Sequence, residues 1–171
     1  MAYRFSTQAL AQFGGSTTGP GRMVNRANAL SGHTLKGRPV EMVLDYDVGA
    51  SDATNDVVLL AKLDPGVIVL PAKSILWRQA AGNTYTVDIG TYDLVDPENP
   101  AEDDPDKFCD GLAIASAGTS RFSDGGTPVG LTTPTPESGE RWLAMKLVSV
   151  STPTAGAKLR FNIELLYGEV N

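Results

Sequence analysis

The chain has 171 residues, of which 42% are hydrophobic and 20% are charged. This length suits one domain with a single core, and the composition excludes a chain that is disordered throughout or built of membrane spans. The net charge of −6 is divided unevenly, because residues 1–38 hold five bases and no acid, whereas residues 93–106 hold seven acids and no base.

The first 36 residues are rich in Gly, Ser, Thr, Ala and Gln, and the run at residues 13–21 interrupts any helical or strand period. Such a segment cannot offset alone an ordering cost of about 1–2 kcal/mol per residue. A plain flexible terminus is one interpretation, but the apolar and basic residues favour an arm that docks on a partner protein. The candidate partner-binding residues are Arg4, Phe5, Phe13, Arg22 and Arg26.

From residue 37 onward, short apolar runs alternate with Gly, Pro, Asn and Asp, which indicates strands and turns. We therefore predict two parts, an arm at residues 1–36 and a β domain at residues 37–171. Residues 40–46 alternate as a half-buried strand does, whereas residues 57–63 are apolar at nearly every position. The second pattern predicts a strand covered on both sides, by sheet and loop or by a neighbouring subunit.

Asp64-Pro65-Gly66 favours a type II turn, which we expect to carry the chain round a corner between two sheets. Two further runs, residues 67–70 and 74–79, are separated by Pro71, which marks an edge or a bend. Residues 84–89 predict another half-buried strand.

The acidic run at residues 93–106 predicts a solvated loop that its three prolines hold extended, although clustered carboxylates leave calcium binding open. We expect residues 108–117 to form a short helical turn that leads into a strand, with a brief pairing at residues 121–122. Residues 127–139 predict an extended surface loop because they contain three prolines among Thr, Ser and Gly.

Two long alternating strands, residues 141–150 and 157–167, close the chain. The turn between them predicts an antiparallel pair, and the last strand should be central to the fold. About eight strands with scarcely any helix predict an all-β, antiparallel β-sandwich with an extended N-terminal arm. A jelly roll is the expected topology. An immunoglobulin-like sandwich is the alternative, although its Cys, Trp, Cys pattern is absent.

Residues that could carry catalysis or hold a cofactor are scarce. His33 is the only histidine and Cys109 the only cysteine, so no zinc site can be assembled, and no nucleophile elbow or Walker A loop occurs. We predict no enzymatic activity, cofactor or metal. Acidic neighbours should raise the pKa of Cys109, which we expect to be buried. Core packing is the expected role of five aromatic residues: Trp77, Tyr85, Tyr92, Trp142 and Tyr167.

The arm's five bases are spread too thinly for a phosphate-binding patch, and the rest of the chain is acidic, so we predict no nucleic-acid partner and no membrane partner. An acidic protein surface is the better match for the arm. The chain also lacks the long apolar stretch of a secretory signal at its start, so we expect no export.

Three runs carry a resemblance: Val57 to Pro71, Tyr85 to Gly90, and Asp110 to Gly118. In these runs the chain resembles the small β-sandwich structural proteins of tailed bacteriophages, especially jelly-roll capsid decoration, or cement, proteins. The resemblance implies a protein made in the host cytoplasm and carried on the capsid surface of the virion. It would bind the major capsid protein lattice, stabilise the head and associate with itself as a homodimer or homotrimer.

Two other functions remain open at this point. A phage tail, neck or head-fibre component would share the fold and differ in its place on the particle. A carbohydrate-binding β-sandwich module would need an exposed aromatic platform for its sugar.

Overall fold

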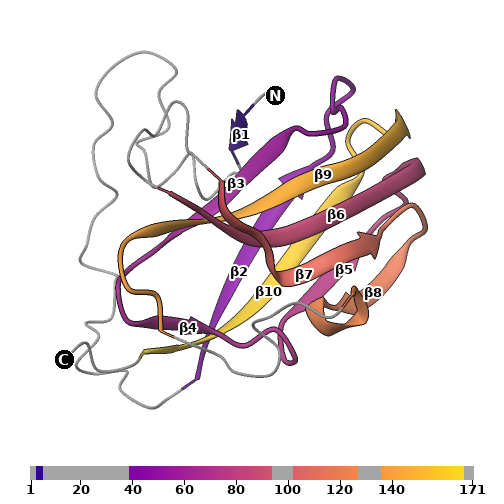
Figure 1. Cartoon of the computed structure of the whole chain (residues 1–171). Helices are drawn as coiled ribbons and strands as arrows, with labels where there is room; N and C mark the ends of the chain where they lie inside the picture. Colours follow the sequence, from indigo (N-terminus) through magenta and orange to yellow (C-terminus); the bar gives the residue numbers. More distant parts are fainter. Residues whose placement is uncertain (1–2, 6–38, 94–101, 127–135, 168–171) are drawn as a thin grey trace.

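The computed structural model describes residues 3–5, 39–93, 102–126 and 136–167. Its regular structure is ten strands and one 3-10 turn, η2, at Phe122–Asp124 (Figure 1). The strands are β1 (Tyr3–Phe5), β2 (Val40–Asp47), β3 (Val57–Leu63), β4 (Val67–Val69), β5 (Ile75–Arg78), β6 (Gly82–Asp93), β7 (Glu102–Ala113), β8 (Gly118–Arg121), β9 (Arg141–Pro153) and β10 (Lys158–Tyr167).

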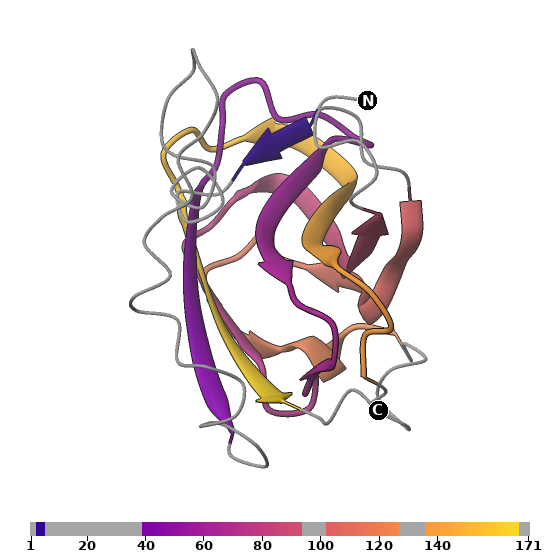
Figure 2. The same cartoon turned by 90° about the vertical axis from the view of Figure 1, so that its left-hand side faces the viewer.

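These strands form two sheets that pack as separate layers (Figure 2). The first sheet has the order β1-β3-β9-β6-β7, and the second has the order β2-β10-β5-β8, with β4 also paired to β10. Without β1, each sheet has the four-strand order of a jelly roll, and the pairings within it are antiparallel. The predicted fold class is confirmed.

The core lies between the sheets, where alternate residues of each strand point inward. The faces predicted for the last two strands are confirmed, because their inward residues are at most 4% exposed. Burying the four inward side chains of β10 contributes about 6–12 kcal/mol gross, at about 1.5–3 kcal/mol each. Those residues are Leu159, Phe161, Ile163 and Leu165, and their β9 counterparts are Leu143, Met145 and Leu147.

The predicted pairing of the last two strands is wrong. β9 pairs with β3 and β6 in the first sheet, whereas β10 pairs with β2, β4 and β5 in the second. The short connection between them crosses from one sheet to the other, and its amide groups bind other loops: Thr154 N–H donates to Ala81 O, and Gly156 N–H donates to Val48 O. Both strands carry a strongly apolar face, and these faces bury each other across the core.

The region of residues 102–113 also differs from the prediction of an acidic loop followed by a helical turn. It forms one strand, β7, which pairs with β6 through several bulges and ends the sheet order. A Cβ atom added to Gly90 would overlap the backbone of Asp104 and Pro105, so glycine lets β7 lie close to β6. The brief pairing predicted next is confirmed for Arg121, opposite Ile75.

The predicted turn after β3 is confirmed. Val67 N–H donates to Asp64 O at 3.2 Å, and Gly66 has a φ of 83°, as a type II turn requires of its third residue. The turn carries the chain from β3 in the first sheet to β4 in the second. The bend at Pro71 then separates β4 from β5, and both strands pair with β10.

A buried carboxylate joins the two sheets near the β2–β3 connection. Asp52 is 5% exposed and accepts hydrogen bonds from Tyr46 Oη at 2.9 Å and Tyr85 Oη at 2.8 Å. Gly49 N–H donates to the same carboxylate at 2.9 Å. Tyr46 belongs to β2 and Tyr85 to β6, so this one side chain bonds to both layers.

Candidate interaction surfaces

The five predicted partner-binding residues fall in two groups. Arg4 and Phe5 lie in β1, opposite Val58 and Leu59 of β3, so the start of the predicted loose arm is a strand in the chain's own sheet. The other three, Phe13, Arg22 and Arg26, lie outside the described residues. Their role as partner contacts stays a prediction.

The outer face of the second sheet carries two exposed apolar side chains. Val43 on β2 and Trp77 on β5 are each 45% exposed. The prediction that Trp77 packs in the core is therefore wrong, because its neighbour Leu76 is the residue of β5 that points inward. The same prediction is confirmed for Tyr85, and Tyr167 packs partly buried against the core. Tyr92 and Trp142 are fully buried as expected, but in a second apolar cluster that is separate from the core between the sheets.

Charges on this outer face, which we call the Trp77 face, are paired across strands. Arg160 Nε donates to Asp45 Oδ1 at 2.7 Å, and this hydrogen bond raises the pKa of Arg160. Lys158 pairs with Asp47 at 2.8 Å in the same way. A depression of about 390 Å³ lies on the same face, lined by Pro39, Glu41, Lys73, Ile75, Asn162 and Glu164. Asp45 and Asp47 neutralise Arg160 and Lys158 on this face. Trp77 is the largest exposed apolar side chain among the described residues of this face.

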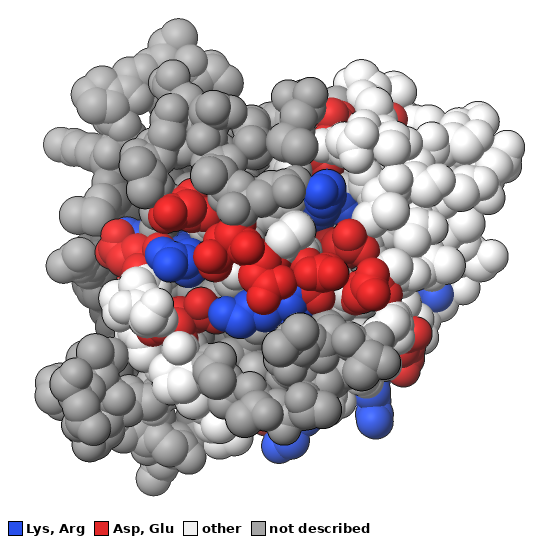
Figure 3. All heavy atoms as spheres, in the orientation of Figure 1, with Lys and Arg blue, Asp and Glu red and all other residues white. Residues whose placement is uncertain are grey.

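A second surface is acidic. Figure 3 shows a band of acidic side chains, with a few bases among them, across the view in which β6 and β7 face the reader. We call this band the acidic face. It includes Asp88, Asp93, Asp103, Asp104 and Asp106.

The pKa values of two carboxyl groups in the acidic face, those of Asp88 and Asp104, are raised. Burial raises the pKa of Asp88, and the charges of Asp110 and Asp106 raise it further, against a hydrogen bond from Gly111 N–H. Burial and the neighbouring Asp106 raise the pKa of Asp104. Burial is the larger cause of both raised pKa values, and the like charges of neighbouring carboxylates add to it.

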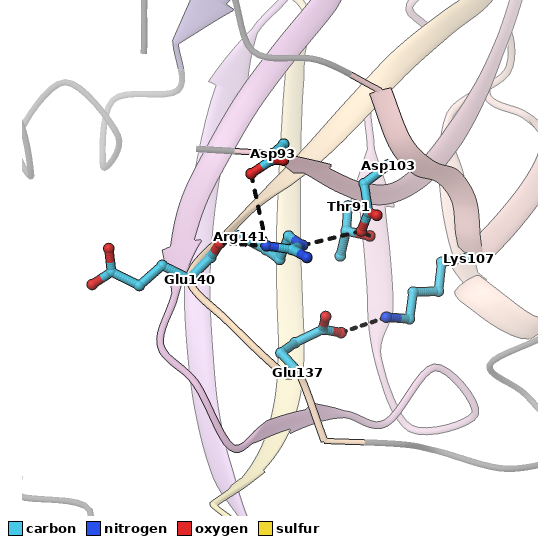
Figure 4. Close-up of polar contacts among 7 residues, drawn as sticks. All are labelled: Thr91, Asp93, Asp103, Lys107, Glu137, Glu140 and Arg141. Atoms are coloured by element: carbon cyan, nitrogen blue, oxygen red, sulfur yellow. Dashed lines mark hydrogen bonds and ion pairs between the residues drawn. The ribbon is translucent and has the colours of Figure 1, made fainter. Parts of the chain in front are cut away.

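One base lies at the end of the acidic face where β6 ends and β9 begins. Arg141, at the start of β9, lies between Asp103 at 3.2 Å and Asp93 at 3.7 Å, while Thr91 donates to Asp103 at 2.9 Å (Figure 4). This cluster fastens the first residues of β7 to the ends of β6 and β9. Its geometry gives it a structural role, because every described charge in it is directed at another.

A second ion pair holds the segment before β9. Glu137 is 5% exposed and accepts a hydrogen bond from Lys107 Nζ at 2.7 Å (Figure 4). The Glu137 backbone also bonds Gly66 and Val67, at 2.8 and 2.9 Å. The end of the predicted surface loop, whose residues 127–135 lie outside the described residues, is therefore held against the β3–β4 turn by two backbone hydrogen bonds and against β7 by the Lys107–Glu137 pair.

The chemistry expected of Cys109 is confirmed in part. The side chain is buried, and burial first, then the charge of Asp88, raises its pKa to about 12. Acidic neighbours do raise the value as predicted, but burial is the larger cause. A thiol in this setting stays protonated and unreactive.

Metal ligands are not grouped in the part of the chain that the structure describes: no three His, Cys, Asp or Glu side chains there could hold one ion. His33 and residues 94–101 lie outside it, so calcium binding by the acidic run stays open. Within the described ranges, no helix has the length and apolar character that crossing a membrane requires.

Comparisons with known proteins place the fold. No family model matches the chain, and no curated protein matches it in sequence. A protein chain in the capsid of Ralstonia phage GP4 superposes with a TM-score of 0.66, covering 99% of this chain and 100% of that one at 16% identity. The chain has the fold of a phage capsid component. The resemblance predicted to β-sandwich proteins of phage particles is thus confirmed for the fold.

Proposed function

We propose that this chain is a non-enzymatic structural protein of a tailed-phage particle that binds the assembled major capsid protein lattice as a decoration, or cement, protein. The observation that carries the proposal is the end-to-end match of its jelly roll to a chain of a phage capsid. The two-part organisation, with an arm at residues 1–36 and a sandwich at residues 37–171, belongs to the same proposal.

Binding to an assembled lattice stabilises the lattice by mass action, because the separated subunits do not offer the same composite surface. We assign lattice contact to the Trp77 face. Two basic side chains on this face are already paired within the chain, and large exposed aromatic side chains such as Trp77 dominate the energy of protein interfaces. Self-association as a dimer or trimer would present several such faces at once and raise the avidity for a repeating shell.

Cosedimentation tests the proposal directly. Purified protein should pellet with particles that lack it and raise their heat resistance, whereas failure to pellet would reject the function. A Trp77→Ser variant should lose most of this binding, and Val148→Ser, which removes an exposed apolar side chain from the other sheet, should keep it. Equal binding by both variants would reject the Trp77 face but not the function. Light scattering after size exclusion gives the oligomeric state.

A tail, neck or head-fibre component is an alternative that differs only in position. Electron microscopy of particles carrying a tagged chain separates the two: a repeating pattern over the shell supports a decoration protein, and label at one vertex or on the tail supports the alternative.

A carbohydrate-binding module is the second alternative, and one observation favours it. Trp77 is the exposed aromatic platform that such a site requires, and the depression on the same face is lined by polar groups of Glu41, Asn162 and Glu164. A glycan array with the purified chain tests this function. Binding that Trp77→Ser abolishes would support it over lattice binding.

A further inference from the structure

The orders of the two sheets end in four strands, β1, β7, β2 and β8, and three of these are poorly suited to pair with a further strand. β1 is three residues long and β8 is four. β7 is longer, but Pro105 and several bulges interrupt its row of backbone groups. Short strands, prolines and bulges are devices by which proteins keep the edges of their sheets from pairing with other chains.

β2 lacks these devices. It is eight residues long, contains no proline, and pairs with β10 along its whole length without a shift in register. Its inward side chains carry no charge, because Leu44 and Tyr46 lie in the core and Met42 packs against it. Figure 2 shows the strand, in purple, at the outside of its layer, with β10, in yellow, on one side of it. Of the four terminal strands, β2 is therefore the one suited to accept another strand.

The hydrogen bonds to β10 show which backbone groups of β2 face the open side. Val48 N–H, just beyond the strand, donates to Ala157 O at 2.9 Å. Because such bonds alternate along an antiparallel strand, the even-numbered residues of β2 bond to β10, and the odd-numbered residues direct their N–H and C=O groups away from it. The sheet order places no described strand on that side. The residues that face it include Glu41, Val43 and Asp47.

The outward side chains of β2 are mostly acidic, since the strand contains Glu41, Asp45 and Asp47 and no base. Asp45 and Asp47 pair with bases of β10, but every side chain in these pairs is at least 41% exposed. Exposed pairs contribute little free energy, so a further base can share these carboxylates at small cost. Glu41 lies opposite another acid, Glu164, and among the described residues it pairs with no base. The open edge therefore favours a strand with basic side chains.

A second copy of the chain fits this edge poorly. Two β2 strands paired antiparallel about Val43 would place Glu41 of each copy opposite Asp45 of the other, and a register two residues along would place it opposite Asp47. Like charges directly opposite each other destabilise an antiparallel pair. On its inner side, an added strand would lie beside Met42, which is partly buried against the core. The occupant that fits is an extended segment with basic side chains on one face and apolar side chains on the other.

We propose that the open edge of β2 binds, by strand addition, an extended segment of the major capsid protein whose side chains alternate between basic and apolar. The inference rests on the proposed function for the identity of this partner. Main-chain hydrogen bonds to the added strand supply affinity, and the alternate side chains supply specificity. The contact adjoins the Trp77 face, because the outward side chains of β2 belong to both, so the two contacts would reinforce each other on one lattice.

Hydrogen exchange in the full chain tests whether the edge is open. In dilute protein, the amide of Val43 should exchange at least about ten-fold faster than those of Met42 and Leu44, which bond to β10. Slow exchange at Val43 in the dilute chain would mean that another segment of the chain already covers the edge. Protection that grows with protein concentration would mean that a second copy covers it. Either result would overturn the proposal.

A peptide of sequence KVKVTVK tests the occupant, because it alternates basic with uncharged side chains. It should bind the chain and slow the exchange of the Val43 amide, whereas EVEVTVE should do neither. Val43→Pro removes the outward N–H without removing a bond to β10, and it should weaken binding of the basic peptide about ten-fold. The matched control Val43→Thr keeps the N–H and should bind as the native chain does. Equal binding of the two peptides, or by the two variants, would overturn the proposal.

Cosedimentation with particles that lack the protein separates this inference from the function. Glu41→Lys leaves the backbone unchanged and reverses one edge charge, so it gives the same test if the proline variant is unfolded. The native chain and Val43→Thr should pellet with the particles, whereas Val43→Pro and Glu41→Lys should pellet several-fold less. Equal pelleting of all four would overturn the role of the edge and leave the function intact. Failure of the native chain to pellet would reject the function, and the identity of the partner with it.

Discussion

The buried carboxylate of Asp52 should be worth more to stability than any surface charge of this chain. It is 5% exposed and bonds to tyrosines from both sheets, Tyr46 and Tyr85. Replacement by alanine removes the acceptor of both hydroxyl groups, and losing a buried partner costs about 1–3 kcal/mol for each group. We therefore expect Asp52→Ala to lower the free energy of unfolding by about 3 kcal/mol or more. For a chain of this length, that corresponds to a fall of about 6–12 °C in Tm.

The bridge can be separated from a mere cavity effect by smaller changes. Asp52→Asn keeps the shape and loses the charge, so it should cost about 1–2 kcal/mol, because hydrogen bonds to a charged group are the stronger ones. Tyr46→Phe and Tyr85→Phe should cost about 1 kcal/mol each. Asp47→Ala is the matched surface control: it breaks only an exposed pair with Lys158 and should stay within about 1 kcal/mol.

Denaturant unfolding followed by circular dichroism measures these differences, and a double-mutant cycle tests the bridge itself. If one carboxylate joins both hydroxyl groups, Asp52→Ala combined with Tyr85→Phe should cost less than the sum of the two single variants, by about 1 kcal/mol. Strict additivity, or an Asp52→Ala cost no larger than that of Asp47→Ala, would refute the idea that this carboxylate ties the two layers together.

Three other outcomes follow from the structure. Gly90→Ala should destabilise the chain by about 3 kcal/mol, because the added methyl group meets the backbone of Asp104 and Pro105, whereas Gly156→Asn, at an open turn with a φ of 80°, should cost under about 1 kcal/mol; thermal melts compare them. Unfolding returns Cys109 from a pKa of about 12 to its ordinary 9.0, so the unfolded state loses its proton first, and this thiol should lower stability by about 1.4 kcal/mol per pH unit between pH 9 and about 12. In denaturant titrations, Cys109→Ala should have a shallower alkaline slope by that amount, since Tyr167, whose pKa burial also raises, still contributes in the same direction. A chain that ends at Gly156 loses β10, the strand bonded to β2, β4 and β5, and should neither remain soluble nor show a cooperative transition in calorimetry.

The strands and their faces could be predicted from the sequence because burial on one side leaves a period of two. This period is seen in the inward residues of β10 and in those of β9, which are Leu143, Met145 and Leu147. Which strands pair with each other has no such local pattern in the sequence. The four residues between β9 and β10 would suit a hairpin equally well, and the crossing between sheets depends on contacts with Ala81 and Val48, which are distant in sequence.

The acidic segment before Cys109 has the composition of a loop but the position of an edge strand. Acids and Pro105 are poor residues for a central strand, but they suit the last strand of a sheet, where charge and proline discourage pairing with another molecule. Gly90 is the residue in the sequence that could have indicated this strand. A glycine within the alternating strand predicts a close approach of backbone, and β7 makes that approach.

The two tryptophans show where sequence reasoning about interaction surfaces reached its limit. Each follows the period of its strand correctly, and in each case that period places the ring on the outside of a sheet. Whether an outward ring meets water or protein depends on what the rest of the chain lays over the sheet, and no local pattern encodes that. Trp77 is 45% exposed and Trp142 is 0% exposed. The exposed ring of Trp77 is why the proposed function assigns attachment to the Trp77 face, on the outer side of the second sheet.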